Sequence, residues 1–327
     1  MNVNNQALGK RKTASASVAG NLKEARRRYS TRSKCKPTSR LFDLACRGDW
    51  KAASRRFDTN QKDILWVNEK DERNIIHCIA TKPWRKNAAP LSLVRDIINA
   101  SPHWAVVQQD KYGYTPLHRA AQYDADIKVF QLLLAAANNA SAALVTKMFP
   151  SFPHDLLPTI VSYISDKPLL IQDRLGRVPL GCLHWTDANI DQARFLFEAA
   201  PSACEFLLLG QLPRLHQFCA LELEESRHML KLVAEHIPKE LFVSRDSIRG
   251  RTPLHCAVES YTSRYFHAFR HEYAACEENI RLLIEICPSA LLYHDSHGRT
   301  PIDVALARYC HRGLFEILER SVLELFA

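Results

Sequence analysis

The sequence predicts an all-α fold, a solenoid of about seven helix-turn-helix units joined by short hairpins. Three observations predict it. A Thr-Pro-Leu-His segment recurs, whole or altered, at intervals of about 40 residues, and apolar residues at helical spacing follow its copies. Proline and glycine also stand at matching places between the copies. Because one such unit cannot bury its apolar face alone, we expect the units to stack around one continuous core.

The recurring segment is complete at residues 115–118 and 252–255 and altered elsewhere. The last copy replaces Leu-His by Ile302-Asp303, and the copies around residues 75, 180 and 215 keep only some of the pattern. The residues assigned to this motif are His77, Thr115, Pro116, Leu117, His118, His216, Thr252, Pro253, Leu254, His255, Thr300 and Pro301.

We predict that this motif builds helix N-termini. A threonine hydroxyl and a histidine ring can satisfy the N–H groups that a helix start leaves open, and proline suits the first helical position. The alternative is a metal or catalytic set of histidines. Helices pack roughly 8–10 Å apart, so His77 and His255, four units apart, would lie about 30–40 Å from each other and could not share an ion. No metal site and no cofactor are predicted.

The rest of each unit consists of a second helix and a turn. Apolar residues recur at helical spacing in 127–134, 193–197, 229–233 and 280–286. Prolines 102, 201, 238 and 288 stand at or just after the expected ends of second helices, which they cannot continue. The stretches 110–113, 173–176 and 295–298 place Asp first and Gly fourth, as type I turns favour.

Four segments carry a resemblance to a known family. They are the Gly-x-Thr-Pro-Leu-His stretches beginning at Gly113 and Gly250, Gly298-Arg-Thr-Pro-Ile, and Leu44-Ala-Cys-Arg-Gly-Asp. These resemble ankyrin repeats. The resemblance extends over residues 41–327, with units starting near 41, 72, 113, 176, 211, 250 and 298. Insertions at about 137–167 and 261–276 make these units longer than the usual repeat of about 33 residues.

The resemblance implies a non-enzymatic scaffold or adaptor that binds another protein on its concave face and hairpin tips. Arg73, Arg177, Arg251 and Arg299 each precede the Thr position, where a row of guanidinium groups would pair with an acidic or phosphorylated segment. The alternative is that a long polar residue is ordinary at an exposed hairpin. The candidate partner-binding residues are Arg73, Tyr112, Tyr114, Arg119, Arg174, Arg177, Arg249, Arg251, His297 and Arg299.

Positive charge is concentrated in residues 1–40, which hold eleven Lys or Arg and one acidic residue, a net of +10 in a chain of net +9. Low apolar content predicts a disordered basic tail there. Arg26, Arg27 and Arg28 suit nuclear import or nucleic-acid contact, a regulator that binds nucleic acid being the alternative function. A solvated tail and an organelle transit peptide stay open as alternatives. Ser30 follows these arginines as in a basophilic kinase site.

Other classes of protein lack support in the sequence. The ten cysteines are dispersed, without a Cys-x2-4-Cys pair or an apolar signal segment, and are expected to be free thiols in a reducing compartment. We find no hydrolase, metalloprotease or phosphate-loop motif. No stretch approaches 18 apolar residues, so no membrane insertion is expected. The prediction is a monomer in the cytoplasm, the nucleus or both.

Overall fold

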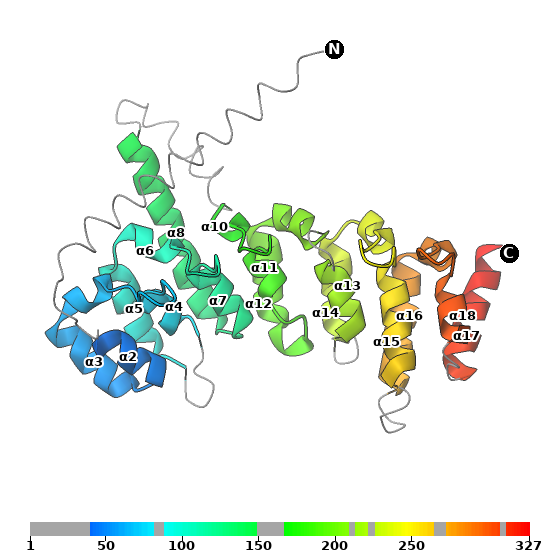
Figure 1. Ribbon diagram of the computed structural model, residues 1–327, viewed down its shortest axis with the longest axis horizontal. Helices are drawn as coiled ribbons and strands as arrows, with labels where there is room; N and C mark the ends of the chain where they lie inside the picture. Colours follow the sequence, from blue (N-terminus) through cyan, green and yellow to red (C-terminus); the bar gives the residue numbers. More distant parts are fainter. Residues whose placement is uncertain are drawn as a thin grey trace, which may run out of the picture.

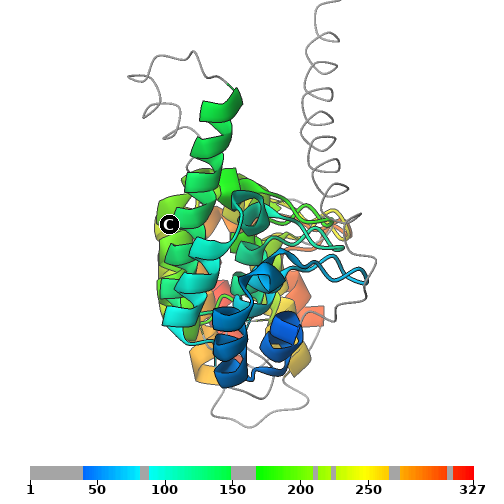
Figure 2. The same ribbon diagram turned by 90° about the vertical axis from the view of Figure 1, so that its left-hand side faces the viewer.

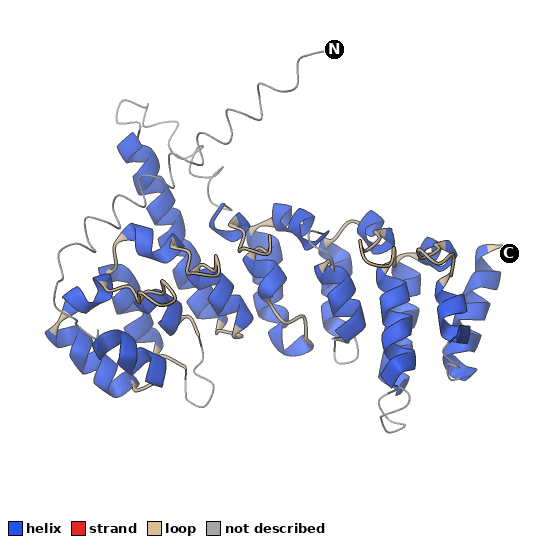
Figure 3. Ribbon diagram, in the orientation of Figure 1, coloured by secondary structure: helices blue, strands red, loops and turns tan. Residues whose placement is uncertain are grey.

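The computed structural model describes residues 40–81, 88–148, 167–208, 213–221, 226–264, 273–307 and 312–327. Pairs of helices stand side by side in an elongated row that follows the order of the sequence (Figure 1). Within these ranges the chain forms helices and loops and no strand, apart from an isolated bridge between Val67 and Asn74 (Figure 3). The all-α class predicted from the sequence is therefore confirmed for the described residues.

The helices pair in chain order, each pair holding a first and a second helix. The pairs are α2 (Arg40–Arg47) with α3 (Trp50–Thr59), α4 (Ile75–Ile79) with α5 (Leu91–Ala100), α7 (Pro116–Gln122) with α8 (Ile127–Met148), α11 (Pro179–Cys182) with α12 (Ile190–Ala199), α13 (Arg214–Leu221) with α14 (Arg227–His236), α15 (Pro253–Arg264) with α16 (Tyr273–Ile286), and α17 (Pro301–Ala307) with α18 (Arg312–Leu325). Contacts between first helices join α2 to α4, α4 to α7, α7 to α11, α13 to α15 and α15 to α17, and contacts between second helices join α5 to α8, α8 to α12, α12 to α14, α14 to α16 and α16 to α18.

Short helices follow several second helices, and a further one lies between α11 and α12; the sequence patterns did not predict them. Four of them begin at or directly after the prolines that were expected only to end a helix. Proline has no N–H and a fixed φ, so it can end one helix and start the next. The short helices are η1 (Gln61–Leu65), α6 (His103–Val107), α10 (Lys167–Leu170), η3 (Asp187–Asn189), η4 (Pro201–Leu208), η6 (Lys239–Val243) and η7 (Pro288–Leu292).

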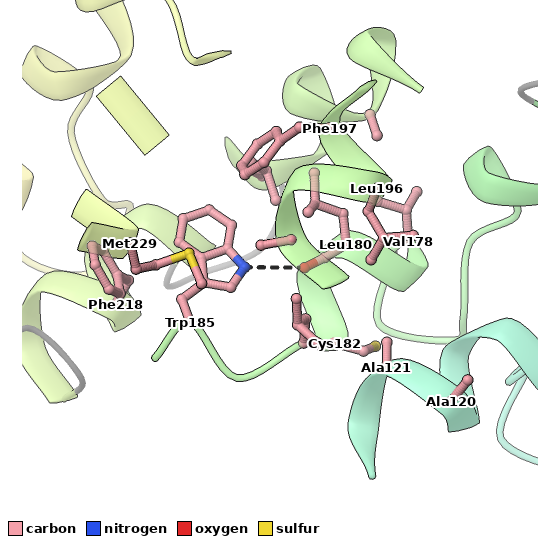
Figure 4. Packing of buried hydrophobic residues seen from close by; sticks show 14 of the residues in the cluster. Ala120, Ala121, Val178, Leu180, Cys182, Trp185, Leu196, Phe197, Phe218 and Met229 are labelled. Carbon is pink, nitrogen blue, oxygen red and sulfur yellow. Dashed lines mark hydrogen bonds between the residues drawn. The ribbon is translucent and has the colours of Figure 1, made fainter. Parts of the chain in front are cut away.

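The apolar core runs along the whole row between first and second helices. Its largest fully buried side chain is Trp185, in the loop that follows the four-residue helix α11. The Trp185 ring lies 5.4 Å from the Phe218 ring on α13 and 6.0 Å from the Phe197 ring on α12 (Figure 4). Trp185 thus fills the joint between two consecutive helix pairs.

Several sequence predictions fall at the limits of the described residues. Helix α8 continues to Met148 and extends beyond its neighbours, so the predicted insertion at 137–167 begins as helix (Figure 1). In the second insertion, α15 continues to Arg264 and α16 begins at Tyr273. Residues 1–39, with Arg26–Arg28 and Ser30, lie outside the described residues, as does the predicted unit start near 211.

Candidate functional site

The hairpins between helix pairs project to one side of the row, where they form a common edge (Figure 2). We call this the hairpin edge and define it as residues 68–73, 110–114, 173–177, 246–251 and 295–299. An Asp carboxylate organises the turn. One oxygen of Asp110, Oδ1, accepts hydrogen bonds from the backbone N–H groups of Tyr112 at 2.8 Å and Tyr114 at 3.0 Å. Asp173 and Asp295 repeat this arrangement, whereas Oδ1 of Asp246 accepts from the N–H groups of Ile248 and Arg249.

Adjacent hairpins are joined through their backbones. The Arg174 N–H donates to the Tyr112 carbonyl at 3.2 Å, and the Ser296 N–H donates to the Arg249 carbonyl at 2.8 Å. Gly113 allows the close approach: its φ is +85°, and a Cβ there would lie 2.7 Å from the Arg174 nitrogen. These bonds hold neighbouring tips in a fixed register.

The arginine row lies on this edge, but its charges are paired within the chain. The second oxygen of Asp173 accepts from Arg177 Nε at 2.9 Å, and that of Asp295 accepts from Arg299 Nη2 at 2.8 Å. Arg73 pairs in the same way with Asp71. The three side chains are 33–36% exposed, so each remains partly accessible to solvent.

Burial alone would raise the pKa of Asp295, but the Arg299 guanidinium and the backbone N–H groups of the turn hold it well below its usual range. The Asp295 carboxylate therefore stays ionised at neutral pH, and its ion pair with Arg299 stays intact. The first role of these paired arginines is therefore to stabilise the turn.

Two of the candidate arginines are buried. Arg251 is 4% exposed and pairs with Glu259. Its Nε atom lies 3.7 Å from Asp295 Oδ2. Arg119 is 8% exposed and donates from Nε to Asp110 Oδ2 at 3.1 Å. Their geometry gives them a supporting position beneath the edge rather than on its surface.

Tyr114 takes the place of an arginine in its hairpin and connects two units. The Arg119 guanidinium lies 4.3 Å from the centre of its ring, within cation–π range. Arg177 Nη2, from the next hairpin, donates to the Tyr114 hydroxyl at 2.6 Å. The Tyr114 side chain thus connects Arg119 of its own unit with Arg177 of the next hairpin.

Large apolar side chains are exposed at the tips of this edge. Tyr112, Leu175 and Ile248 are 53%, 68% and 60% exposed, and each stands two residues after the turn Asp. His297, with its side chain 62% exposed, occupies the same place in the last hairpin. The sequence patterns pointed to Tyr112 and His297 as candidates but not to Leu175 and Ile248. The position two residues after Asp would have revealed all four.

The motif histidines lie in the interior, between units. His118 Nδ1 accepts from the Thr115 N–H at 3.2 Å, so Nε2 carries the proton and donates to the Arg177 carbonyl at 3.0 Å. His77 and His255 bond to the Tyr114 and Arg299 carbonyls at 3.1 Å and 2.9 Å. Each ring therefore caps its own helix and holds the residue that opens the next unit's motif.

Other kinds of site find no support in the described ranges. No group of three or more His, Cys, Asp or Glu side chains there is arranged to hold a metal ion. None of the helices described combines the length and apolar character needed to cross a membrane.

A family model matches one of the repeated units. Residues 112–144 match the model of the ankyrin repeat. The chain contains an ankyrin repeat. The matched residues begin at the exposed tip Tyr112 and include the second part of the hairpin, the complete motif at 115–118 and most of α8. The ankyrin resemblance expected from the sequence is confirmed for these residues, and ankyrin repeats in general mediate binding between proteins.

Other comparisons are more distant. No curated protein is significantly similar to the chain in sequence. A chain in the solved structure of a predatory endopeptidase from Bdellovibrio bacteriovorus in complex with an immunity protein is 14% identical, with a TM-score of 0.35. The alignment covers 86% of this chain and 96% of that chain.

Proposed function

We propose that this chain is a non-enzymatic adaptor, an ankyrin solenoid of about seven units over residues 41–327 that binds another protein through its hairpin edge. The observation that carries the proposal is the set of exposed apolar tips at Tyr112, Leu175 and Ile248. Exposed apolar side chains gathered along one surface mark interaction sites in many proteins. Leu175 and Ile248 lie outside the buried core, so their apolar side chains are available to a partner.

The chemistry of the edge favours a partner segment with apolar and acidic side chains. Arg174 and Arg249 lie next to Leu175 and Ile248, and Arg249 is half exposed with Glu259 as its partner. Apolar side chains of the partner would contact the tips, and its carboxylates would pair with these arginines. We extend the proposed binding surface to the concave face along the first helices.

The test compares binding by two variants. Leu175→Ser combined with Ile248→Ser removes two tips, and Leu323→Ser on α18 removes an equally exposed leucine, 66% exposed, away from the edge. Proteins captured by each variant are quantified by mass spectrometry against the unmodified chain, with circular dichroism as the check of folding.

We expect the proteins enriched by the unmodified chain to be lost from the edge variant by at least tenfold and retained by the Leu323 variant. Retention of the same proteins by the folded edge variant would contradict the proposal.

A second candidate function rests on the +10 charge of residues 1–40. Such a segment could supply sequence-independent contacts to the phosphates of a nucleic acid while the helical region recruits a protein. Binding to duplex DNA should then fall steeply with salt and disappear when residues 1–39 are removed. Salt-independent binding, or binding that survives the deletion, would reject it.

A further inference from the structure

Two cysteines that are distant in the sequence lie in contact at the start of the row. Cys46 is the second-last residue of α2, and Cys78 lies in α4, the first helix of the next pair. Their Sγ atoms are 3.1 Å apart. An S–S bond of about 2.05 Å therefore requires an approach of about 1 Å.

We propose that Cys46 and Cys78 form a reversible disulfide that locks the first helix pair to the second. The inference is independent of the proposed function. The two thiols have unequal surroundings, which assigns each a role. Cys46 is exposed and can meet a reagent from solvent, whereas Cys78 is 3% exposed and faces Cys46 from within.

The electrostatics agree with these roles. The hydrogen bond from the Cys78 thiol lowers the pKa of Cys46, and the positive charge of Arg73 acts in the same direction, while partial burial opposes them. The hydrogen bond to Cys46 and burial raise the pKa of Cys78. Of the two thiols, Cys46 therefore loses its proton more readily, and the thiolate is the form that attacks disulfides.

The oxidant is a small disulfide such as glutathione disulfide. The Cys46 thiolate attacks one of its sulfur atoms, so a Cys46–glutathione bond forms and one glutathione thiolate leaves. Cys78 then gives up its proton and attacks Cys46 Sγ, which releases the second glutathione. The chain is oxidised by two electrons, glutathione disulfide is reduced by two, and the two thiol protons end on the two glutathione molecules.

The other buried cysteines provide the contrast. Burial raises the pKa of Cys182 and of Cys256 to about 12. Cys219 is fully enclosed, and burial raises its pKa well above the usual value. These thiols combine low accessibility with little thiolate, so they should remain reduced under conditions that oxidise Cys46.

The experiment equilibrates the full chain with mixtures of reduced and oxidised glutathione, blocks free thiols by alkylation and analyses the peptides by mass spectrometry. We expect a linked Cys46–Cys78 peptide and a loss of 2 Da per chain, reversed by reductant, while Cys182 and Cys256 stay alkylated. Hydrogen exchange in α2 should slow at least several-fold in the oxidised chain.

Variants separate the two roles. In Cys46→Ser, Cys78 should stay reduced. In Cys78→Ala, Cys46 should stop at the glutathione adduct. Arg73→Gln should slow alkylation of Cys46 at pH 7 several-fold, and Arg73→Lys should restore it. The proposal is overturned if Cys46 stays free, stays glutathionylated beside a free Cys78 in the unmodified chain, or bonds to Cys35 instead.

Discussion

The motif histidines connect adjacent units as neutral rings, because their two nitrogens have different partners. In His118, Nδ1 accepts from the Thr115 N–H and Nε2 donates to the Arg177 carbonyl. A second proton would place a donor against the Thr115 N–H. Burial accordingly lowers the pKa of His118, and likewise of His77, to about 4.

This lowered pKa predicts loss of stability in mild acid. In the unfolded chain these histidines take up a proton near pH 6.5, and in the folded chain only near pH 4. Their contribution to the free energy of unfolding is therefore complete above pH 6.5 and falls as the pH drops toward 4. Between pH 7 and pH 5 the loss should be about 2 kcal/mol per histidine. Urea unfolding at both pH values measures it.

The matched variant is His118→Gln, which cannot titrate. Its difference in unfolding free energy between pH 7 and pH 5 should be smaller than that of the unmodified chain, because only His77 and the less strongly shifted histidines contribute. An equal difference in both proteins would show that His118 does not titrate in this range.

His216 has the same place in its unit but lacks one of these bonds. The residue three positions before it is Pro213, which has no N–H, and His216 Nδ1 finds no hydrogen-bond partner among the described residues. Its Nε2 donates to two carbonyls, those of Ser244 and Arg251. A buried acceptor without a donor costs stability.

Restoring the donor should therefore stabilise the chain. Pro213→Thr supplies an N–H and a capping hydroxyl, and we expect a gain of about 1 kcal/mol after the lost rigidity of proline is subtracted. Pro213→Ala supplies the N–H alone and should give less. Chemical denaturation measures both, and a threonine variant less stable than the original would refute this account.

At the scale of the element, the hairpins depend on the register of their tips. Gly113 and Gly298 both have φ values in the left-handed region, +85° and +73°. Their surroundings differ: a Cβ on Gly113 would lie 2.7 Å from the Arg174 nitrogen, whereas a Cβ on Gly298 would have no neighbour within 4 Å. Alanine substitutions at these two glycines therefore separate the cost of backbone strain from the cost of packing.

Gly298→Ala should cost only the strain of the left-handed conformation, about 1–2 kcal/mol. Gly113→Ala should cost about 1–3 kcal/mol more, because the Arg174 backbone must move away and its bond to Tyr112 is weakened. Urea unfolding measures the two costs, and faster amide exchange at Arg174 in the Gly113 variant locates the effect. Equal losses of stability in the two variants would show that packing against the Arg174 backbone does not contribute.

The hairpins also show what sequence could and could not predict. The Asp and Gly at fixed spacing predicted the turns because both act locally, through the carboxylate and a left-handed φ. The pairing of Arg177 with Asp173 was missed, although it spans four residues, because a sequence does not show which carboxylate oxygen remains free. The contact between Cys46 and Cys78 needed the packing of two helices, which no local pattern contains.

Across the whole molecule, stability depends on contacts between neighbouring units, and one joint is built differently. Gly181 stands where the fourth unit would have its motif histidine, so the usual bond to the next unit has no donor there. Trp185 takes over: its ring packs on Phe218, its carbonyl accepts from the Ser226 hydroxyl at 2.9 Å, and the Arg214 guanidinium lies 5.0 Å from its ring.

Removing this ring should uncouple the two halves of the row. Trp185→Ala should cost about 3–5 kcal/mol and split a single unfolding transition into two, because the units before and after the joint would each keep their own histidine bonds.

Phe57→Ala, in the first helix pair, removes a buried aromatic ring away from the joint and is the control. It should weaken the first pair and leave the remaining units in one transition. Calorimetry with hydrogen exchange distinguishes the cases, and a single transition in the Trp185 variant would place the coupling elsewhere, since the second helices α12 and α14 also meet across this joint.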